Sequence, residues 1–291
     1  MVITNMKIAV LSGKGGAGKT FVAVNLASTI GKASYIDCDV EEPNGRLFFK
    51  PDNLKTVDVT TPIPIFDENK CNGCRKCVDF CNFNALLYIK NKHMLFNEVC
   101  HACGGCELVC PQNAISQGER IIGKVETGKH KSIDVISGVL NTGEASGVKV
   151  IEKAQAIGNK KNNISIIDCP PGSACSVMES IADVDYCILV VEPTAFGLHN
   201  FKMVYELTNV LNKPCGIIIN KETNRYESLY KFCKDNNIDI LANIPYDKKI
   251  ASIIASGGIA SEHSEKLNNI FNCIFTTIKS KLGGAVLWKS Y

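Results

Sequence analysis

The sequence lacks the features that would place the protein in a membrane or on nucleic acid. Its 291 residues contain no run of about 18 consecutive apolar residues, the length that a membrane-spanning helix needs. Lys and Arg number 32 against 29 Asp and Glu, so the net charge of +3 supplies no strongly basic field. The first residues show no signal-peptide pattern. We therefore expect a cytoplasmic protein that binds neither a membrane nor nucleic acid.

Cysteine, in contrast, is abundant and unevenly distributed. The chain contains 15 cysteines, and eight of them lie between residues 71 and 110. Cytoplasmic thiols stay reduced, so disulfide bonds are not their expected role. Clustered thiols in a reducing compartment favour a metal site.

Short apolar runs alternate with amphipathic stretches over most of the chain. The runs predict strands at residues 7–12, 33–39, 164–168, 186–191, 215–220 and 239–244. The amphipathic stretches predict helices at residues 19–31, 144–158, 174–182, 197–212 and 225–236, and a terminal helix around 267–278. Such alternation implies right-handed βαβ crossovers, and nearly continuous apolar strands imply helices on both faces of the sheet. The predicted fold class is α/β, with a mainly parallel, doubly wound sheet.

The alternation stops between residues 61 and 118. This segment opens with two prolines, contains the clustered cysteines and shows no long helical period, and the regular pattern resumes only near residue 133. An insertion explains this break. We predict one α/β domain in two parts, residues 1–60 and 119–291, around an inserted cysteine-rich domain at residues 61–118.

A glycine-rich segment near the start predicts a nucleotide site. Residues 13–20, GKGGAGKT, match the phosphate-binding pattern G-x-x-x-x-G-K-[ST] between a predicted strand and a predicted helix. Glycines let backbone N–H groups turn around phosphate oxygens, and the helix adds its positive N-terminal end. Lys19 would reach the β- and γ-phosphates and Thr20 would bind Mg²⁺. The predicted loop residues are Gly13, Lys14, Gly15, Gly16, Ala17, Gly18, Lys19 and Thr20.

The clustered cysteines form two runs with the same spacing, 29 residues apart. In each run the cysteines follow one another at intervals of three, three and four residues. This is the spacing of bacterial ferredoxins, in which the fourth cysteine of each run ligates the other [4Fe–4S] cluster. The predicted ligands of cluster one are Cys71, Cys74, Cys77 and Cys110. Those of cluster two are Cys81, Cys100, Cys103 and Cys106. A pair of zinc knuckles is the alternative, but such repeated runs are not the usual zinc spacing.

Lys14 is not required by a general phosphate-binding loop. Its presence in KGGAGKT resembles the deviant Walker A loop of the MinD/ParA/Mrp superfamily, which includes the nitrogenase iron protein. Residues 37–44, DCDVEEPN, and 168–172, DCPPG, resemble the two switch segments of that family. GIIIN, ending at Asn220, and NIPYD at residues 243–247 resemble its base-binding segments. Taken together, the chain resembles MinD-superfamily P-loop ATPases with an inserted ferredoxin domain.

The resemblance implies an ATPase that closes around Mg-ATP as a homodimer, or as a heterodimer with a paralogue. Lys14 would act in trans on the partner's phosphates, the role that an arginine finger plays elsewhere. Asp39 would orient or deprotonate the attacking water. Thr20, Asp39 and Asp168 would surround Mg²⁺, with Asp168 acting through water.

The resemblance also assigns the base of the nucleotide. Asn220 would read adenine, and Pro245 and Tyr246 would contact the base from the loop that closes over it. ATP is favoured over GTP by the resemblance, and the NKE sequence that starts at Asn220 lacks the aspartate of a guanine-reading NKxD motif.

Three functions remain open on the sequence. One is an ATP-dependent redox protein, in which nucleotide binding gates electron transfer to a redox partner. The second is an Mrp-like ATPase that assembles or carries iron–sulfur or other metal clusters for an accepting protein. The third, with the least support, is a positioning switch of the ParA or MinD kind. Cys175 and Cys169, which flank the second switch, have no assigned role, and Cys38, Cys187, Cys215, Cys233 and Cys273 are expected to be buried small residues.

Overall fold

The computed structural model describes residues 5–288, with side chains up to residue 283. Over these residues a nine-stranded sheet has the strand order β11-β10-β9-β1-β8-β2-β7-β6-β3. Its strands are β1 (Met6–Leu11), β2 (Ser34–Asp37), β3 (Asp52–Phe66), β6 (Ile115–His130), β7 (Ile133–Leu140), β8 (Ile164–Asp168), β9 (Tyr186–Val191), β10 (Cys215–Glu222) and β11 (Asp239–Pro245). Strands β11 to β7 pair in parallel, whereas β6 and β3 extend the sheet antiparallel. The α/β class and the mainly parallel sheet are confirmed.

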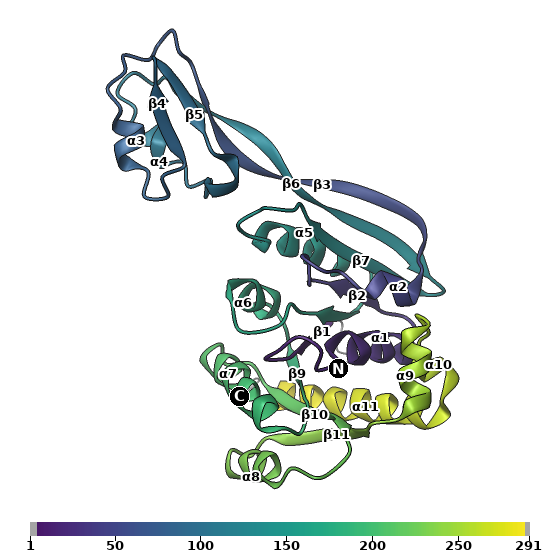
Figure 1. Ribbon diagram of the computed structural model, residues 1–291. Helices are drawn as coiled ribbons and strands as arrows, with labels where there is room; N and C mark the ends of the chain where they lie inside the picture. The colour runs from purple at the N-terminus through teal and green to yellow at the C-terminus, as the bar shows by residue number, and fades with distance from the viewer. Residues whose placement is uncertain (1–4, 289–291) are drawn as a thin grey trace.

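Helices cover both faces of the parallel part, as predicted (Figure 1). One layer contains α1 (Lys19–Ile30), α2 (Gly45–Phe49), α9 (Lys248–Ala255), α10 (Ala260–His263) and α11 (Glu265–Trp288). The other contains α5 (Val148–Gly158), α6 (Cys175–Ile181), α7 (Ala195–Val210) and α8 (Glu227–Asp235). Successive residues of β1 face opposite layers: Ile8 and Val10 pack in the first and Ala9 and Leu11 in the second. Two apolar cores therefore hold the sheet between them.

The terminal helix α11 behaves as its sequence pattern predicts. Leu267, Phe271, Ile274 and Ile278 are buried in the first core, and the ring of Phe271 meets that of Phe21 of α1 edge to face, 6.0 Å between centroids. Cys273 was expected to be buried but is exposed, because it lies outside the apolar stripe that α11 packs into the first core. No helix within residues 5–288 combines the length and apolarity needed to cross a membrane.

Strands β3 and β6 form a long antiparallel ribbon that leaves the sheet and carries a small unit at its far end (Figure 1). The unit contains α3 (Lys76–Phe80), β4 (Leu86–Ile89), β5 (Lys92–Leu95), a 3₁₀ helix (Asn97–Val99) and α4 (Gly105–Leu108). All eight clustered cysteines lie within it. The break in the sequence pattern thus coincides with a structural change, and the expected boundaries after residues 60 and 118 fall inside the two ribbon strands.

Candidate functional site

The nucleotide-binding pattern forms the connection between β1 and α1, at the carboxyl edge of the sheet. A cleft of about 980 Å³ opens there, a size suited to a bound small molecule. It is lined by these predicted site residues: Gly15, Gly16, Gly18, Lys19, Thr20, Asp39, Asn220, Pro245 and Tyr246. Ligands of open α/β sheets bind outside the carboxyl ends of the strands, where this cleft lies. Gly13, Lys14, Ala17 and Asp168 are neighbouring positions that do not line it.

The conformation of the loop explains its glycines. Gly18 has φ 101°, a left-handed conformation, and a Cβ there would collide with the side-chain amide of Asn220. That amide donates a hydrogen bond of 2.8 Å to the carbonyl of Ala17. A Cβ at Gly13 would overlap the backbone of Asn200 at the start of α7. In this structure Asn220 therefore holds the loop in shape through its amide group.

Two charged residues of the predicted site face each other in the cleft. The buried Lys19 places its Nζ 3.9 Å from Oδ2 of Asp39. Burial raises the pKa of Asp39 to about 6, although the positive charge of Lys19 partly offsets this effect. An aspartate with such a pKa is ionised at neutral pH but close enough to titration to exchange a proton. The geometry is compatible with a role beside a phosphate group.

Asp168 is the last residue of β8 and is completely buried. Its Oδ2 accepts a hydrogen bond of 2.8 Å from the hydroxyl of Tyr35, whereas its Oδ1 has no hydrogen-bond partner within the described residues. Burial raises the pKa of this carboxyl group, against the opposing charge of Lys19. A buried carboxylate oxygen without a partner fits a magnesium–water shell, since Mg²⁺ takes oxygen ligands and keeps several waters.

Asp37 belongs to this site, although no role was predicted for it. It is fully buried, and its two oxygens accept hydrogen bonds from the backbone N–H groups of Gly45, at 2.9 Å, and Asp39, at 3.2 Å. Burial, with the nearby Asp168 carboxylate, raises its pKa well above the usual value. Asp37 fixes the turn that presents Asp39 to the cleft. The sequence signal for Asp37 is its place at the end of a predicted buried strand, two residues before Asp39.

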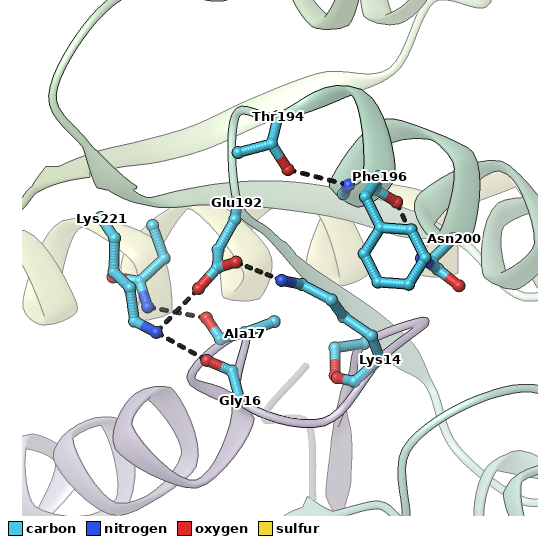
Figure 2. A network of polar contacts seen from close by, with 11 residues as sticks. Lys14, Gly16, Ala17, Glu192, Thr194, Phe196, Asn200 and Lys221 are labelled. Carbon is cyan, nitrogen blue, oxygen red and sulfur yellow. Dashed lines mark hydrogen bonds and ion pairs between the residues drawn. The ribbon is translucent and has the colours of Figure 1, made fainter.

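A network around Glu192 holds the loop from the side of α7 (Figure 2). Its carboxylate pairs with Nζ of Lys14 and lies 2.7 Å from Nζ of Lys221, which also donates a 2.7 Å hydrogen bond to the carbonyl of Gly16. Burial raises the pKa of Glu192, but the two lysines outweigh this effect and hold it below its usual value. Lys14 also lies 5.6 Å from the ring centroid of Phe196. Lys14 is thus tied within its own chain.

The two predicted cysteine quartets lie around two separate small cavities. Cys71, Cys74, Cys77 and Cys110 line one, and Cys81, Cys100, Cys103 and Cys106 line the other. Within the described residues no group of three or more His, Cys, Asp or Glu side chains is arranged to hold a metal ion. A [4Fe–4S] cube is larger than one ion, so its four thiolates surround it and do not meet at a single point. The donor set fits such a cube, with each fourth cysteine beside the other run.

Hydrogen-bond donors also point at the cysteine sulfurs of the first quartet. Backbone N–H groups of Gly73 and Ala114 donate to the sulfurs of Cys71, at 3.4 Å, and Cys110, at 3.3 Å. Such bonds stabilise thiolates that ligate iron, and they tune the reduction potential of a cluster.

The cysteines beside residues 168–172, which resemble the second switch, differ from each other. Cys175 is exposed and lines the nucleotide cleft, whereas Cys169 is buried, and burial raises its pKa far above the usual range. A buried thiol of this kind is inert. The two residues therefore do not form a common site on this chain.

Comparisons with known proteins agree with this fold. Residues 8–259 match the CobQ/CobB/MinD/ParA nucleotide binding domain family. An uncharacterized protein of Methanocaldococcus jannaschii is 31% identical over 279 residues, 94% of this chain and 96% of its own length. An iron–sulfur cluster carrier protein of Methanococcus maripaludis is 23% identical over 300 residues, 94% of this chain and 86% of its own length.

Solved structures show the same architecture. The septum site-determining protein MinD of Pyrococcus horikoshii, in complex with Mg-ADP, superposes with a TM-score of 0.57 at 19% identity, covering 93% of this chain and 94% of its own. This likeness concerns the fold. With the family match over most of the chain and the loop geometry described above, the protein belongs to the CobQ/CobB/MinD/ParA family of nucleotide-binding domains.

Proposed function

We propose that the protein is a Mg-ATP-hydrolysing iron–sulfur protein in which nucleotide binding controls electron transfer through two [4Fe–4S] clusters. The observation that carries this proposal is the position of the two cysteine quartets. They lie at the end of a ribbon whose strands belong to the sheet that also positions the nucleotide loop. One continuous sheet therefore joins the candidate clusters to the candidate ATP site.

At the ATP site, the loop N–H groups and Lys19 bind the β- and γ-phosphates. Thr20 and Asp168 would hold Mg²⁺, which would supply positive charge against the phosphates. Asp39 orients the attacking water and accepts its proton, a role that suits a carboxyl group with a pKa of about 6. Asn220, Pro245 and Tyr246 surround the adenine. Hydrolysis is slow until the site is completed by a second subunit.

Lys14 completes the site of the partner subunit in an ATP-dependent homodimer, or in a heterodimer with a paralogue. In the single chain Glu192 pairs with Lys14, so closure of the dimer requires Lys14 to exchange this carboxylate for a phosphate group of the partner's nucleotide. The second contact of Glu192, to Lys221, keeps its charge compensated after that exchange.

At the other end of the ribbon, residues 61–118 form a ferredoxin-like domain. Cys71, Cys74, Cys77 and Cys110, which line one cavity, would hold cluster one, and Cys81, Cys100, Cys103 and Cys106, which line the other, would hold cluster two. A [4Fe–4S] cluster held there would supply one-electron transfer between a low-potential donor and an acceptor protein. The exposed apolar side chains of this domain, including Phe80, Phe83 and Leu108, suit contact with such a partner.

A cluster carrier is the second candidate, favoured by the relative that is named an iron–sulfur cluster carrier protein. One anaerobic experiment on reconstituted protein separates the two. Electron-carrying clusters remain bound through ATP turnover and change their EPR signal when ATP is added. Carried clusters move to an apo-acceptor protein, and iron is lost from the ATPase in equal amount. Transfer of both clusters during turnover would overturn the electron-transfer proposal.

A further inference from the structure

Arg120 of β6 connects the two ends of the molecule. Its guanidinium forms a bidentate pair with Glu144, in which Nη2 lies 2.9 Å from Oε2, and the same Nη2 donates a 3.1 Å hydrogen bond to the backbone carbonyl of Asn97. The side chains of Arg120 and Glu144 are 18% and 9% exposed. A bidentate pair so shielded from water has a defined geometry, unlike an exposed ion pair.

The carbonyl of Asn97 leads directly to cluster two. It also accepts a hydrogen bond of 3.3 Å from the backbone N–H of Cys100, the first cysteine of the second run. Arg120 and the Cys100 backbone therefore share one acceptor atom. A shift of Arg120 moves that oxygen and with it the backbone that carries a predicted cluster ligand. Among the residues that the structure describes, no equivalent ion pair reaches the first quartet from the ATPase sheet.

Glu144 leads in the other direction, to the nucleotide cleft. It lies in the loop between β7 and α5, and the residues that follow it, 145–147 in the loop and Val148 at the start of α5, line the cleft. The start of the loop is bonded to the first switch, because the N–H of Leu140 donates 2.8 Å to the carbonyl of Val40. Val40 follows Asp39 and packs where Gly138 and Gly147 leave room, since a Cβ at either glycine would clash with it. The switch and this loop are therefore hydrogen-bonded and packed against each other.

We propose that Arg120 is the residue through which nucleotide binding acts on cluster two. Rearrangement of the first switch around the γ-phosphate shifts the loop that carries Glu144. Arg120 follows Glu144, and the carbonyl of Asn97 and the backbone of Cys100 follow Arg120. The inference rests on the proposed function, and it adds a direction: ATP changes the surroundings of cluster two more than those of cluster one. Coupling is reciprocal, so the redox state of cluster two also changes nucleotide affinity.

A second contact at the base of the ribbon provides a matched control. Lys149, in the first turn of α5, donates a hydrogen bond of 2.9 Å to the hydroxyl of Thr61 on β3. This hydrogen bond connects the ribbon to α5, the helix that follows the loop of Glu144. It does not involve the segment before Cys100. Loss of Lys149 loosens the ribbon without breaking the connection to cluster two.

The experiment uses the full chain with reconstituted clusters under anaerobic conditions. Amide hydrogen exchange of residues 97–103 and the EPR signals of both clusters are recorded without nucleotide, with Mg-ADP and with a non-hydrolysable ATP analogue. In the unaltered protein, the ATP analogue changes exchange at residues 97–103 by about fivefold or more, the lower end of typical coupling between sites. In Arg120→Gln this difference falls below about twofold, while nucleotide still binds. Lys149→Ala keeps the full difference.

The response of the unaltered protein tests the proposed function, and the response of Arg120→Gln tests the role of Arg120. If the unaltered protein shows no response to the ATP analogue at either cluster, the proposed function fails. If it responds and Arg120→Gln responds equally, the role of Arg120 is wrong and the proposed function stands. Should Arg120→Gln lose its cooperative unfolding transition, Glu144→Gln replaces it, because that change removes the charge with little change of shape. Arg120→Lys keeps the charge but lacks the planar fork, so we expect an intermediate response.

Discussion

The sheet and the small unit on its ribbon are built in opposite ways. The sheet buries two continuous apolar cores, whereas the small unit and the ribbon end beside it share one small cluster. Its buried residues are Cys77, Leu86 and Ile115, and the partly buried side chains packed against them are Phe66, Val78, Cys81, Leu95, Cys106 and Cys110. Several large apolar side chains of the unit are exposed, up to 86% for Leu108. A unit of this size cannot be stabilised by so little buried apolar surface. On the proposed function, the two clusters would take the place of an apolar core, as metal does in small metal-binding domains.

Removal of a predicted cluster ligand should have the largest effect on the small unit. Cys81→Ser should abolish cluster two, although Cys81 lies in the first run, and Cys110→Ser should abolish cluster one. Each variant should lose about half of its iron, because each cube has four irons. Protease should then cut residues 67–114 while the ATPase sheet stays intact and binds nucleotide. Iron analysis, EPR and limited proteolysis measure these effects.

Cys273→Ser is the matched control for the cysteine variants, since Cys273 is exposed on α11 and far from both cavities. It should retain all iron. If Cys81→Ser instead removed the cluster held by Cys71, Cys74 and Cys77, each run would hold its own cluster and the interlocked arrangement would be wrong.

The second prediction concerns the nucleotide loop of the sheet. Lys19→Ala should lower ATP hydrolysis by at least about 100-fold, because this change removes the lysine that we propose neutralises the β- and γ-phosphates in the transition state. The iron content and the EPR spectrum of the nucleotide-free protein should stay unchanged. Radiolabelled phosphate release and iron analysis on one preparation measure both. Loss of iron in Lys19→Ala would show that the two regions do not fold independently.

The same contrast explains how much the sequence could predict. Six strands of the parallel part were found because helices cover both faces and leave continuous apolar runs, as in residues 186–191. Its seventh strand, β7, was missed, because Asp134 and Ser137 interrupt the apolar run. The nucleotide loop and the two quartets were found because their chemistry requires fixed local spacing. The ribbon strands β3 and β6 were missed. Much of β3 is exposed, and it carries Pro62 and Pro64, so neither an apolar run nor a clear alternation marks it.

Side-chain pairs between segments that are distant in the sequence could not be predicted either. Glu192 and Lys14 are 178 residues apart, and Arg120 and Glu144 pair across a strand and a loop. Local spacing carries no information on such pairs. A sequence signal existed for Glu192, which directly follows strand β9 and begins the segment EPTAFGLHNF, but its partner could be identified only from the fold.

Glu192→Gln tests whether the ion pair with Glu192 restrains Lys14 before a dimer forms. The change weakens the pair that ties Lys14 within its own chain, so Lys14 is freer to reach a partner subunit. We expect the dimer fraction with an ATP analogue to rise by about two- to fivefold, the scale of one partly exposed ion pair. Analytical ultracentrifugation measures this fraction. Asp183→Asn, which breaks the exposed Lys7–Asp183 pair away from the cleft, should leave it unchanged.

A weaker dimer in Glu192→Gln would contradict this reasoning. It would mean that Glu192 supports Lys14 in its active position and does not restrain it.

The smallest expected effect concerns Asp39 and the pH dependence of stability. Its pKa in the folded, nucleotide-free protein is about 6, above the ordinary value of 3.8, so the folded state holds the proton more tightly than the unfolded state. Asp39 therefore favours folding below pH 4, and its contribution becomes unfavourable as pH rises from about 4 to about 6. Asp39→Asn removes this buried charge. It should raise the melting temperature at pH 7.5 by about 2–4 °C, the equivalent of ~1 kcal/mol in a domain of this size, and should give no increase at pH 3.5. Differential scanning calorimetry of the nucleotide-free protein at both pH values measures the difference. An equal increase at both pH values would mean that the charge of Asp39 is not the cause. An increase at pH 7.5 alone would show that the nucleotide site holds a destabilising charge, whose cost the two apolar cores of the sheet offset.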